Sequence, residues 1–186
     1  MHVEGKRCLD AGASTGGFTD VLLRRGADHV VAVDVGYGQL AWELRQNPRV
    51  SIHDRTNIRH LTGDVIGEPI DLVVADLSFI SLTLVLPALA AVSKADANFV
   101  VMVKPQFEVG REKLGAGGVV RDPALRKSAV IDVADSAYDV GLGTSGICAS
   151  PLPGPAGNVE YFLWLRRGAP ELDHAALDEA IAIGPQ

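Results

Sequence analysis

The chain has 186 residues, of which 47% are hydrophobic and 22% charged, and its formal net charge is −6. This length and composition fit one globular domain with a substantial core, and they exclude a disordered chain. Two cysteines, Cys8 and Cys148, give neither a disulfide framework nor metal-ligand spacing, and the five scattered histidines form no metal motif. No signal peptide opens the sequence, so we expect a cytoplasmic protein with a single domain over residues 1–186.

Strand and helix signals alternate along nearly the whole chain, which predicts an α/β fold. We expect about seven mostly parallel strands with helices on both faces of the sheet. The first predicted strand ends at Asp10, and the others cover residues 29–33, 50–53, 70–75, 98–103, 144–149 and 159–166. Helices are predicted at residues 17–25, 39–46, 81–92 (kinked at Pro87), 122–140 and 170–183, and a long loop at 106–121.

A glycine-rich turn joins the first strand to the first helix. A dinucleotide-binding fingerprint would need glycine at positions 12, 14 and 17, but position 14 is Ser14. Asp10 would repel a diphosphate but suits a cationic ligand, and the absence of a Gly-Lys-Ser/Thr sequence excludes a P-loop. An acidic strand end followed by G-x-S-x-G-G resembles motif I of S-adenosylmethionine (SAM) methyltransferases. The alternative is a tight turn that binds no ligand.

Polar side chains fall where four of the predicted strands end, at Asp10, Asp34, Asp76 and Lys104. In an open α/β sheet, ligands bind outside the carboxyl ends of the strands. Asp34 follows Asp10 by 24 residues, a spacing at which a carboxylate accepts hydrogen bonds from a ribose, although the next turn could also satisfy it. Asn57 is placed to reach an adenine edge or to act as a turn residue.

The residues after the predicted fourth and fifth strands favour a hydroxyl group as the methyl acceptor. An amine acceptor would predict an Asp/Asn-Pro-Pro-aromatic motif, whereas residues 76–79 read Asp-Leu-Ser-Phe. A pyrimidine-carbon acceptor would need a nucleophilic cysteine at a strand end, which neither cysteine provides. Lys104 can assist deprotonation of an alcohol. Glu160, at the start of an apolar strand, either pairs with Lys104 or faces solvent.

Five segments together resemble the TlyA (haemolysin A) family of FtsJ-type methyltransferases, namely residues 9–19, 33–40, 76–81, 103–108 and 158–162. The resemblance implies a Rossmann-like class I SAM-dependent methyltransferase fold with SAM as cofactor. It implies 2′-O-methylation of ribose at cytidines in the ribosomal RNA of the small and large subunits, with ribosomal RNA or ribosomal subunits as partners. It also implies that Asp76, Lys104 and Glu160 are the last three members of a catalytic Lys-Asp-Lys-Glu tetrad.

The resemblance and the strand-end positions together predict the residues that bind SAM, and they predict no metal. These residues are Asp10, Gly12, Ser14, Thr15, Gly16, Gly17, Phe18, Asp34, Val35, Asn57 and Asp76. The tetrad's first lysine and the family's N-terminal S4-type RNA-binding domain lie upstream of motif I. We therefore expect this chain to be the catalytic part of a longer protein, in which the upstream domain holds much of the RNA.

Two features of the sequence leave other hypotheses open. Because phosphate contacts need Lys and Arg, a net charge of −6 is unusual for an RNA enzyme. Basic residues still gather in two stretches, as RNA contacts or as solvated surface: Arg45, Arg49, Arg55, Arg59, His60; and Lys104, Arg111, Lys113, Arg121, Arg126, Lys127.

Residues 77–93 carry no charge, which raises a membrane-active haemolysin as one alternative function. A SAM-binding module without catalysis is another. Polar residues and Pro87 within the run favour a buried strand end and helix, so we expect no stable membrane insertion.

Overall fold

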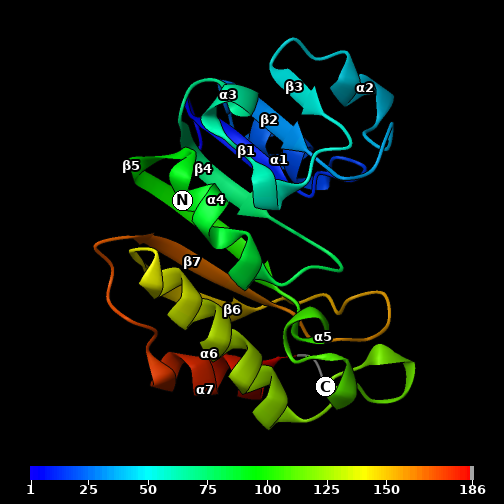
Figure 1. Ribbon diagram of the computed structural model, residues 1–186, viewed down its shortest axis with the longest axis vertical. Coiled ribbons are helices and arrows are strands. Elements are labelled where there is room, and N and C mark those ends of the chain that lie inside the picture. The colour runs from blue at the N-terminus through cyan, green and yellow to red at the C-terminus, as the bar shows by residue number, and fades with distance from the viewer. Residues whose placement is uncertain (185–186) are drawn as a thin grey trace. The chain divides into compact units, whose positions relative to one another are not determined.

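The computed structural model describes residues 1–184, and its strands form a seven-stranded sheet in the order β3-β2-β1-β4-β5-β7-β6 (Figure 1). The strands are β1 (Arg7–Ala11), β2 (His29–Val33), β3 (Val50–His53), β4 (Ile70–Ala75), β5 (Ser93–Val103), β6 (Leu142–Ala149) and β7 (Tyr161–Arg167). The predicted α/β class with about seven strands is confirmed. Residues 185–186, which the predicted domain includes, lie outside the described residues.

Within residues 1–184, seven α-helices and four short 3₁₀ helices lie between or after these strands. The α-helices are α1 (Gly17–Arg24), α2 (Trp42–Arg45), α3 (Gly63–Ile66), α4 (Leu86–Ala91), α5 (Pro105–Glu108), α6 (Pro123–Asp139) and α7 (His174–Ile183). The 3₁₀ helices are η1 (Ile58–His60), η2 (Leu82–Leu84), η3 (Arg111–Lys113) and η4 (Ala116–Gly118). By its internal contacts the chain divides into two compact units. The predicted single domain over residues 1–186 stays a prediction.

The first unit comprises Met1–Asp76 and Pro87–Phe99 and holds the parallel strands β1 to β4. β1 pairs in parallel with both β2 and β4, and Ala11 lies opposite Val33 and Ala75. This register places the residues that follow β2 and β4, Asp34 and Asp76, at the same edge of the sheet as the end of β1. The strands are almost entirely buried from Cys8 to Ala11 and from Val30 to Val33, as expected of strands covered on both faces.

The second unit comprises residues 77–86 and the chain from Val100 onward. Here β6 and β7 pair antiparallel, with an irregularity between Thr144 and Gly146. Tyr161, Leu163 and Leu165 alternate with more exposed residues along β7 and are fully buried, which gives the strand one face toward the core. Both α6 and α7 contact β6.

The predicted helix over residues 81–92 is wrong, because this stretch divides into η2 and α4. The Ser81 side chain accepts a hydrogen bond from the Thr83 N–H and starts a 3₁₀ turn, and α4 begins at Leu86, beside Pro87. Proline has no N–H to donate and is favoured in the first turn of a helix, so it starts a new helix here and does not kink a long one. Strand β5 then begins at Ser93, five residues before the predicted start.

Other differences are smaller. The predicted helix over residues 39–46 is reduced to α2, and the predicted loop at 106–121 contains α5, η3 and η4. Within residues 1–184, no helix is long and apolar enough to cross a membrane. The uncharged run at 77–93 forms a turn, then η2 and α4, and ends at the first residue of β5.

Helix α6 begins as the sequence predicts, with the Asp122 carboxylate accepting a hydrogen bond from the Ala124 N–H at 2.8 Å. We expect Asp122→Ala to lower the free energy of unfolding by about 1 kcal/mol, because that N–H loses its acceptor. Asp122→Asn keeps an acceptor oxygen and serves as the matched control. Urea denaturation measures both, and an alanine variant as stable as wild type would show that the cap does not stabilise the fold.

Candidate active site

The glycine-rich loop after β1 has a left-handed backbone at Gly12, Ser14 and Gly16, with φ of 86°, 47° and 100°. Glycine adopts such angles without steric cost, whereas Ser14 does so as a non-glycine residue held by its surroundings. Its N–H donates to Asp34 Oδ2 at 2.8 Å. The loop at position 14 is therefore tied to the end of β2.

Four of the loop's N–H groups are already used inside the protein. The N–H groups of Gly12 and Ala13 donate to the Val33 carbonyl, that of Ser14 to Asp34, and that of Gly16 to the Ala13 carbonyl. A loop that binds phosphate presents its N–H groups to the anion. These donors point elsewhere, which agrees with the exclusion of a diphosphate ligand.

A cavity of about 400 Å³ lies beside this loop in the first unit. This volume is within the usual range for a small-molecule site. Its walls are Gly12, Ala13, Ser14, Thr15, Gly17, Phe18, Val21 and Asp76. Six of these eight are among the predicted cofactor residues, and Ala13 and Val21 were not predicted. Val21 could have been found from the helical spacing, because it lies one turn after Gly17 on α1.

Asp10 is a buried carboxylate behind the cavity loop, with 1% of its surface exposed. Its Oδ2 accepts a hydrogen bond from the Thr19 hydroxyl at 2.6 Å, and its Oδ1 has no hydrogen-bond partner among the described residues. The pKa of Asp10 is raised to about 6, chiefly by burial and to a smaller extent by the charges of Asp76 and Asp34, while the Thr19 hydrogen bonds oppose the rise. A cationic ligand would relieve this cost, because it favours the ionised form.

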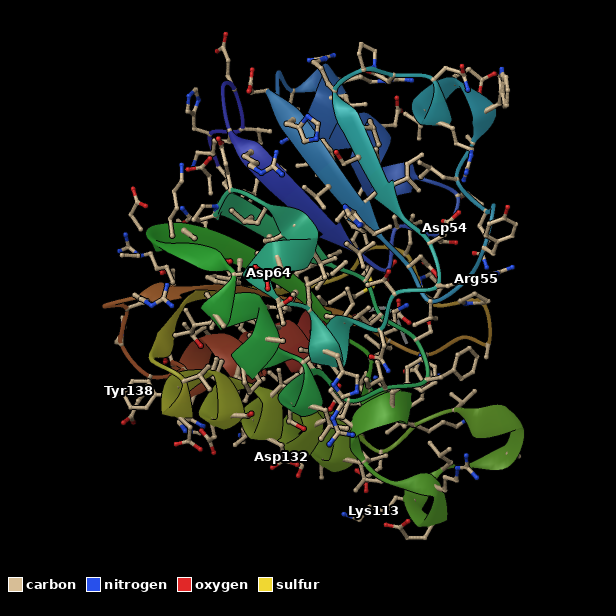
Figure 2. All side chains as sticks on the ribbon, turned by 45° about the horizontal axis from the view of Figure 1, so that its top comes forward. Asp54, Arg55, Asp64, Lys113, Asp132 and Tyr138 are labelled. Atoms are coloured by element: carbon tan, nitrogen blue, oxygen red, sulfur yellow. The ribbon has the colours of Figure 1, made fainter. Side chains whose placement is uncertain are left out.

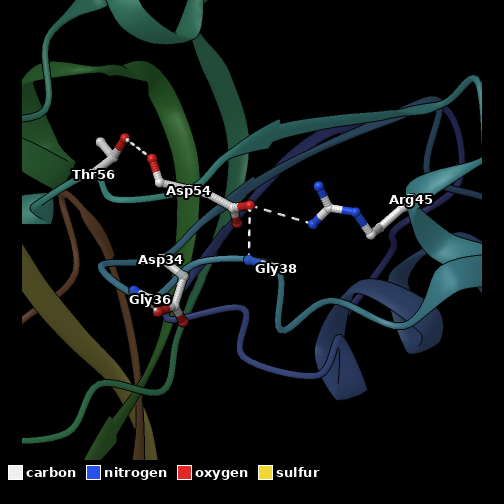
Figure 3. A network of polar contacts seen from close by, with 6 residues as sticks. All are labelled: Asp34, Gly36, Gly38, Arg45, Asp54 and Thr56. Atoms are coloured by element: carbon white, nitrogen blue, oxygen red, sulfur yellow. Dashed lines mark hydrogen bonds and ion pairs between the residues drawn. The ribbon is translucent and has the colours of Figure 1, made fainter.

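The end of β2 is held by a network of polar contacts in which Asp34 and Asp54 each accept backbone N–H groups (Figure 3). Asp34 Oδ1 accepts from Gly36 N at 2.7 Å, and Asp54 accepts from Gly38 N at 3.0 Å and from Arg45 at 3.3 Å. The turn that follows β2 therefore satisfies Asp34 in part, as one reading of the sequence allowed. Each carboxylate oxygen has a second lone pair, so hydrogen bonds from a ribose are still possible.

Four predicted cofactor residues besides Asp10 lie outside the walls of this cavity: Gly16, Asp34, Val35 and Asn57. Gly16 has a packing role, because an added Cβ would collide with the side chains of Leu40 and Leu44. Val35 is 68% exposed. Asn57 caps η1, its Oδ1 accepting from the Arg59 N–H at 3.0 Å, which leaves its amide nitrogen as the donor for an adenine edge.

In the second unit, Lys104 and Gln106 each bind a polar side chain. Lys104 Nζ donates to Ser78 Oγ at 3.3 Å, and Gln106 Nε2 donates to Glu160 Oε1 at 3.2 Å. Glu160 immediately precedes β7 and is 6% exposed, so the solvent-facing reading of this residue is wrong. Gln106 was not predicted; its place two residues after Lys104 is the one sequence signal that could have indicated it.

Several basic residues considered as RNA contacts have structural partners instead. Arg126 is buried and donates to the carbonyls of Val120 and Arg121, both at 3.0 Å. Lys127 pairs with Asp178. Among residues 1–184, no group of three or more His, Cys, Asp or Glu side chains could hold a metal ion.

Comparisons with known proteins agree with this geometry. The family model of FtsJ-like methyltransferases matches residues 1–167. The chain is 60% identical over 188 residues to the 16S/23S rRNA (cytidine-2′-O)-methyltransferase TlyA of Mycobacterium tuberculosis, covering 96% of this chain and 70% of that protein. The chain belongs to the FtsJ-like methyltransferase family.

Two solved structures are similar to this fold. A Streptococcus thermophilus protein that carries the name hemolysin superposes with a TM-score of 0.92 at 40% identity, covering 98% of this chain and 67% of that one. A SAM-dependent methyltransferase of Mesorhizobium loti has a TM-score of 0.65 at 16% identity, covering 90% and 93%, which shows the fold alone. The chain is a methyltransferase with the Rossmann-like fold of SAM-dependent enzymes, and SAM is its cofactor. The carboxylate of Asp76 in the cavity wall, with Asp10 buried behind the loop, fits the sulfonium and ammonium groups of SAM.

The raised pKa of Asp10 predicts that SAM binding depends on pH. Because the carboxylate form attracts a cation and its pKa is about 6, we expect the Kd of SAM to fall about tenfold from pH 5 to pH 7. Calorimetry measures this, below the range in which the ligand's own α-amino group loses its proton. Asp10→Asn is the matched control and should bind SAM weakly at both pH values. A wild-type Kd that does not change between pH 5 and pH 7 would contradict this role for Asp10.

Proposed function

We propose that this chain transfers the methyl group of SAM to the 2′-hydroxyl of cytidine in ribosomal RNA of the small and large subunits. The observation that carries the proposal is Lys104 at the end of β5, with its Nζ donating to the hydroxyl of Ser78. A lysine that already binds a hydroxyl is placed to bind the hydroxyl of a ribose. The identity of 60% with an rRNA (cytidine-2′-O)-methyltransferase supports the RNA substrate.

Different residues of this chain bind the cofactor, deprotonate the acceptor and position these groups in the proposed reaction. The loop from Gly12 to Phe18 and Asp76 would hold the cofactor, which supplies an electrophilic methyl group when bound. Lys104 would bind the attacking hydroxyl and take its proton, a step that contributes about 10²–10⁴ in rate when the group is well placed. Asp76 would orient the hydroxyl or the donor. Glu160 would hold the lysine, and Gln106 fixes the orientation of that buried carboxylate.

An exposed aromatic ring in the second unit supports a nucleic-acid substrate. Phe79 is 91% exposed, and it follows Asp76 by three residues. Exposing a large apolar side chain is unfavourable in water. Unpaired bases of RNA stack on such rings, so Phe79 is suited to hold a base of the RNA substrate. The predicted cytoplasmic location of the protein stays a prediction.

Substituting Lys104 tests the proposed chemistry. We expect Lys104→Ala to lower methyl transfer to isolated ribosomal subunits by roughly a thousandfold, because the hydroxyl loses the group that takes its proton. SAM binding, measured by calorimetry, should change less than about twofold, because Lys104 is proposed to contact the acceptor hydroxyl and not the cofactor.

Lys104→Arg is the matched control for charge. Arginine keeps a cation and its donors but is not deprotonated in proteins, so this variant should remain as inactive as the alanine variant. An active arginine variant would mean that positive charge alone is needed. Turnover of Lys104→Ala at the wild-type rate would remove Lys104 from the mechanism.

Substituting Phe79 tests the substrate class. We expect Phe79→Ala to raise the KM for ribosomal RNA about tenfold, because stacking on a base is worth about 1–3 kcal/mol. Phe79→Tyr keeps the ring and should stay close to wild type. The assay is the same methyl transfer, with subunit concentration varied. An unchanged KM in the alanine variant would show that this ring does not contact RNA.

A further inference from the structure

The turn between β4 and η2 is held in an unfavourable conformation. Phe79 has φ of 65°, in the left-handed region that a bulky residue rarely adopts, and its ring is 91% exposed. A backbone of this kind persists only when the surrounding contacts impose it. Such contacts must therefore exist within the second unit.

Helix α5 supplies these contacts from one short stretch of chain. The rings of Phe107 and Phe79 lie 5.1 Å apart between centroids, inclined at 52°. At the end of the helix, Glu108 Oε2 accepts a hydrogen bond from Ser81 Oγ at 2.5 Å, and Oε1 accepts one from the Leu82 N–H at 2.9 Å. The strained residue itself and the end of the turn are thus attached to the segment that follows Lys104.

The charged form of Glu108 is energetically unfavourable at this position. Burial raises the pKa of its carboxyl group, the two hydrogen bonds lower it, and the charge of Asp132 raises it. Asp132 lies on α6 (Figure 2). This helix packs against both α5 and η2. The surroundings therefore disfavour the charge, and the favourable contribution comes from the two hydrogen bonds to the turn.

We propose that Glu108 is a positioning residue that fixes the Ser78–Phe79 turn for the nucleotide being methylated. It does not touch the substrate itself. Its carboxylate binds Ser81 and the backbone of Leu82, and these hold Phe79 in its exposed, strained conformation and Ser78 beside Lys104. The inference rests on the proposed RNA substrate, because the turn would otherwise have nothing to position.

The test compares three variants with wild type. Glu108→Ala removes both hydrogen bonds, and Ser81→Ala removes one of them from the other side. Glu108→Gln is the conservative variant, because its carbonyl accepts from the Leu82 N–H and its amide donates to Ser81 Oγ. Glu112→Ala, an exposed glutamate on η3, is the control for the loss of a surface charge.

Hydrogen exchange of the Leu82 amide, which donates to Glu108, reports the contact without any activity assay. We expect exchange to accelerate about tenfold or more in Glu108→Ala, less in Ser81→Ala, and to stay near wild type in Glu108→Gln and Glu112→Ala. Exchange that is the same in wild type and Glu108→Ala would overturn the proposal.

Methyl transfer to ribosomal subunits then reports positioning. We expect kcat/KM to fall about tenfold to a hundredfold in Glu108→Ala, at a temperature where the variant is folded, while the Kd of SAM changes less than about twofold. Glu108→Gln should restore kcat/KM to near wild type, which a loss of charge would not. Faster exchange with unchanged kcat/KM would overturn the positioning role. Wild-type protein that binds SAM but methylates no ribosomal RNA would overturn the proposed function, and the positioning role with it, while the exchange rates would still report the contact.

Discussion

The burial of the Asp10 carboxylate decides what the glycine-rich loop can bind. One oxygen is satisfied by Thr19, the other has no partner among the described residues, and Asp34 and Asp76 add negative charge nearby. Four of the loop's own N–H groups meanwhile donate to Val33, Asp34 and Ala13 and are not presented to an anion. A turn with the outline of a nucleotide-phosphate loop is thereby suited to a small cation.

A second arrangement is that five consecutive residues after β5, 104–108, supply most of the contacts around Lys104. Lys104 binds a hydroxyl, Gln106 binds the buried Glu160, Phe107 packs on Phe79, and Glu108 holds the turn at Ser81. Pro105 explains why these directions differ. It keeps Lys104 extended at the strand end and starts a helix at once, so that successive side chains diverge around one turn.

The sequence predicted those features that depend on local chemistry. Strands β2 and β4 begin and end where predicted, because buried parallel strands are continuous apolar runs bounded by turn residues. The half-buried strand β3 also keeps its predicted bounds. The Asp122 cap and the loop residues Gly12 to Phe18 follow from the same kind of signal. The helix predicted over residues 81–92 was wrong because Ser81 and Pro87 act on the backbone more strongly than apolar spacing does. Gln106 and Glu108 were missed because their roles depend on contacts with residues 54 and 27 positions away.

The position of the transferred methyl group tests the central claim most directly. Ribosomal subunits treated with the protein and SAM are digested to nucleosides and analysed by mass spectrometry. A ribose hydroxyl acceptor, bound by Lys104, predicts 2′-O-methylcytidine as the product. Methylcytidine with the methyl group on the base would contradict the account, because the strand ends of this chain carry a lysine for a hydroxyl and neither the proline motif for an amine nor a cysteine for a ring carbon.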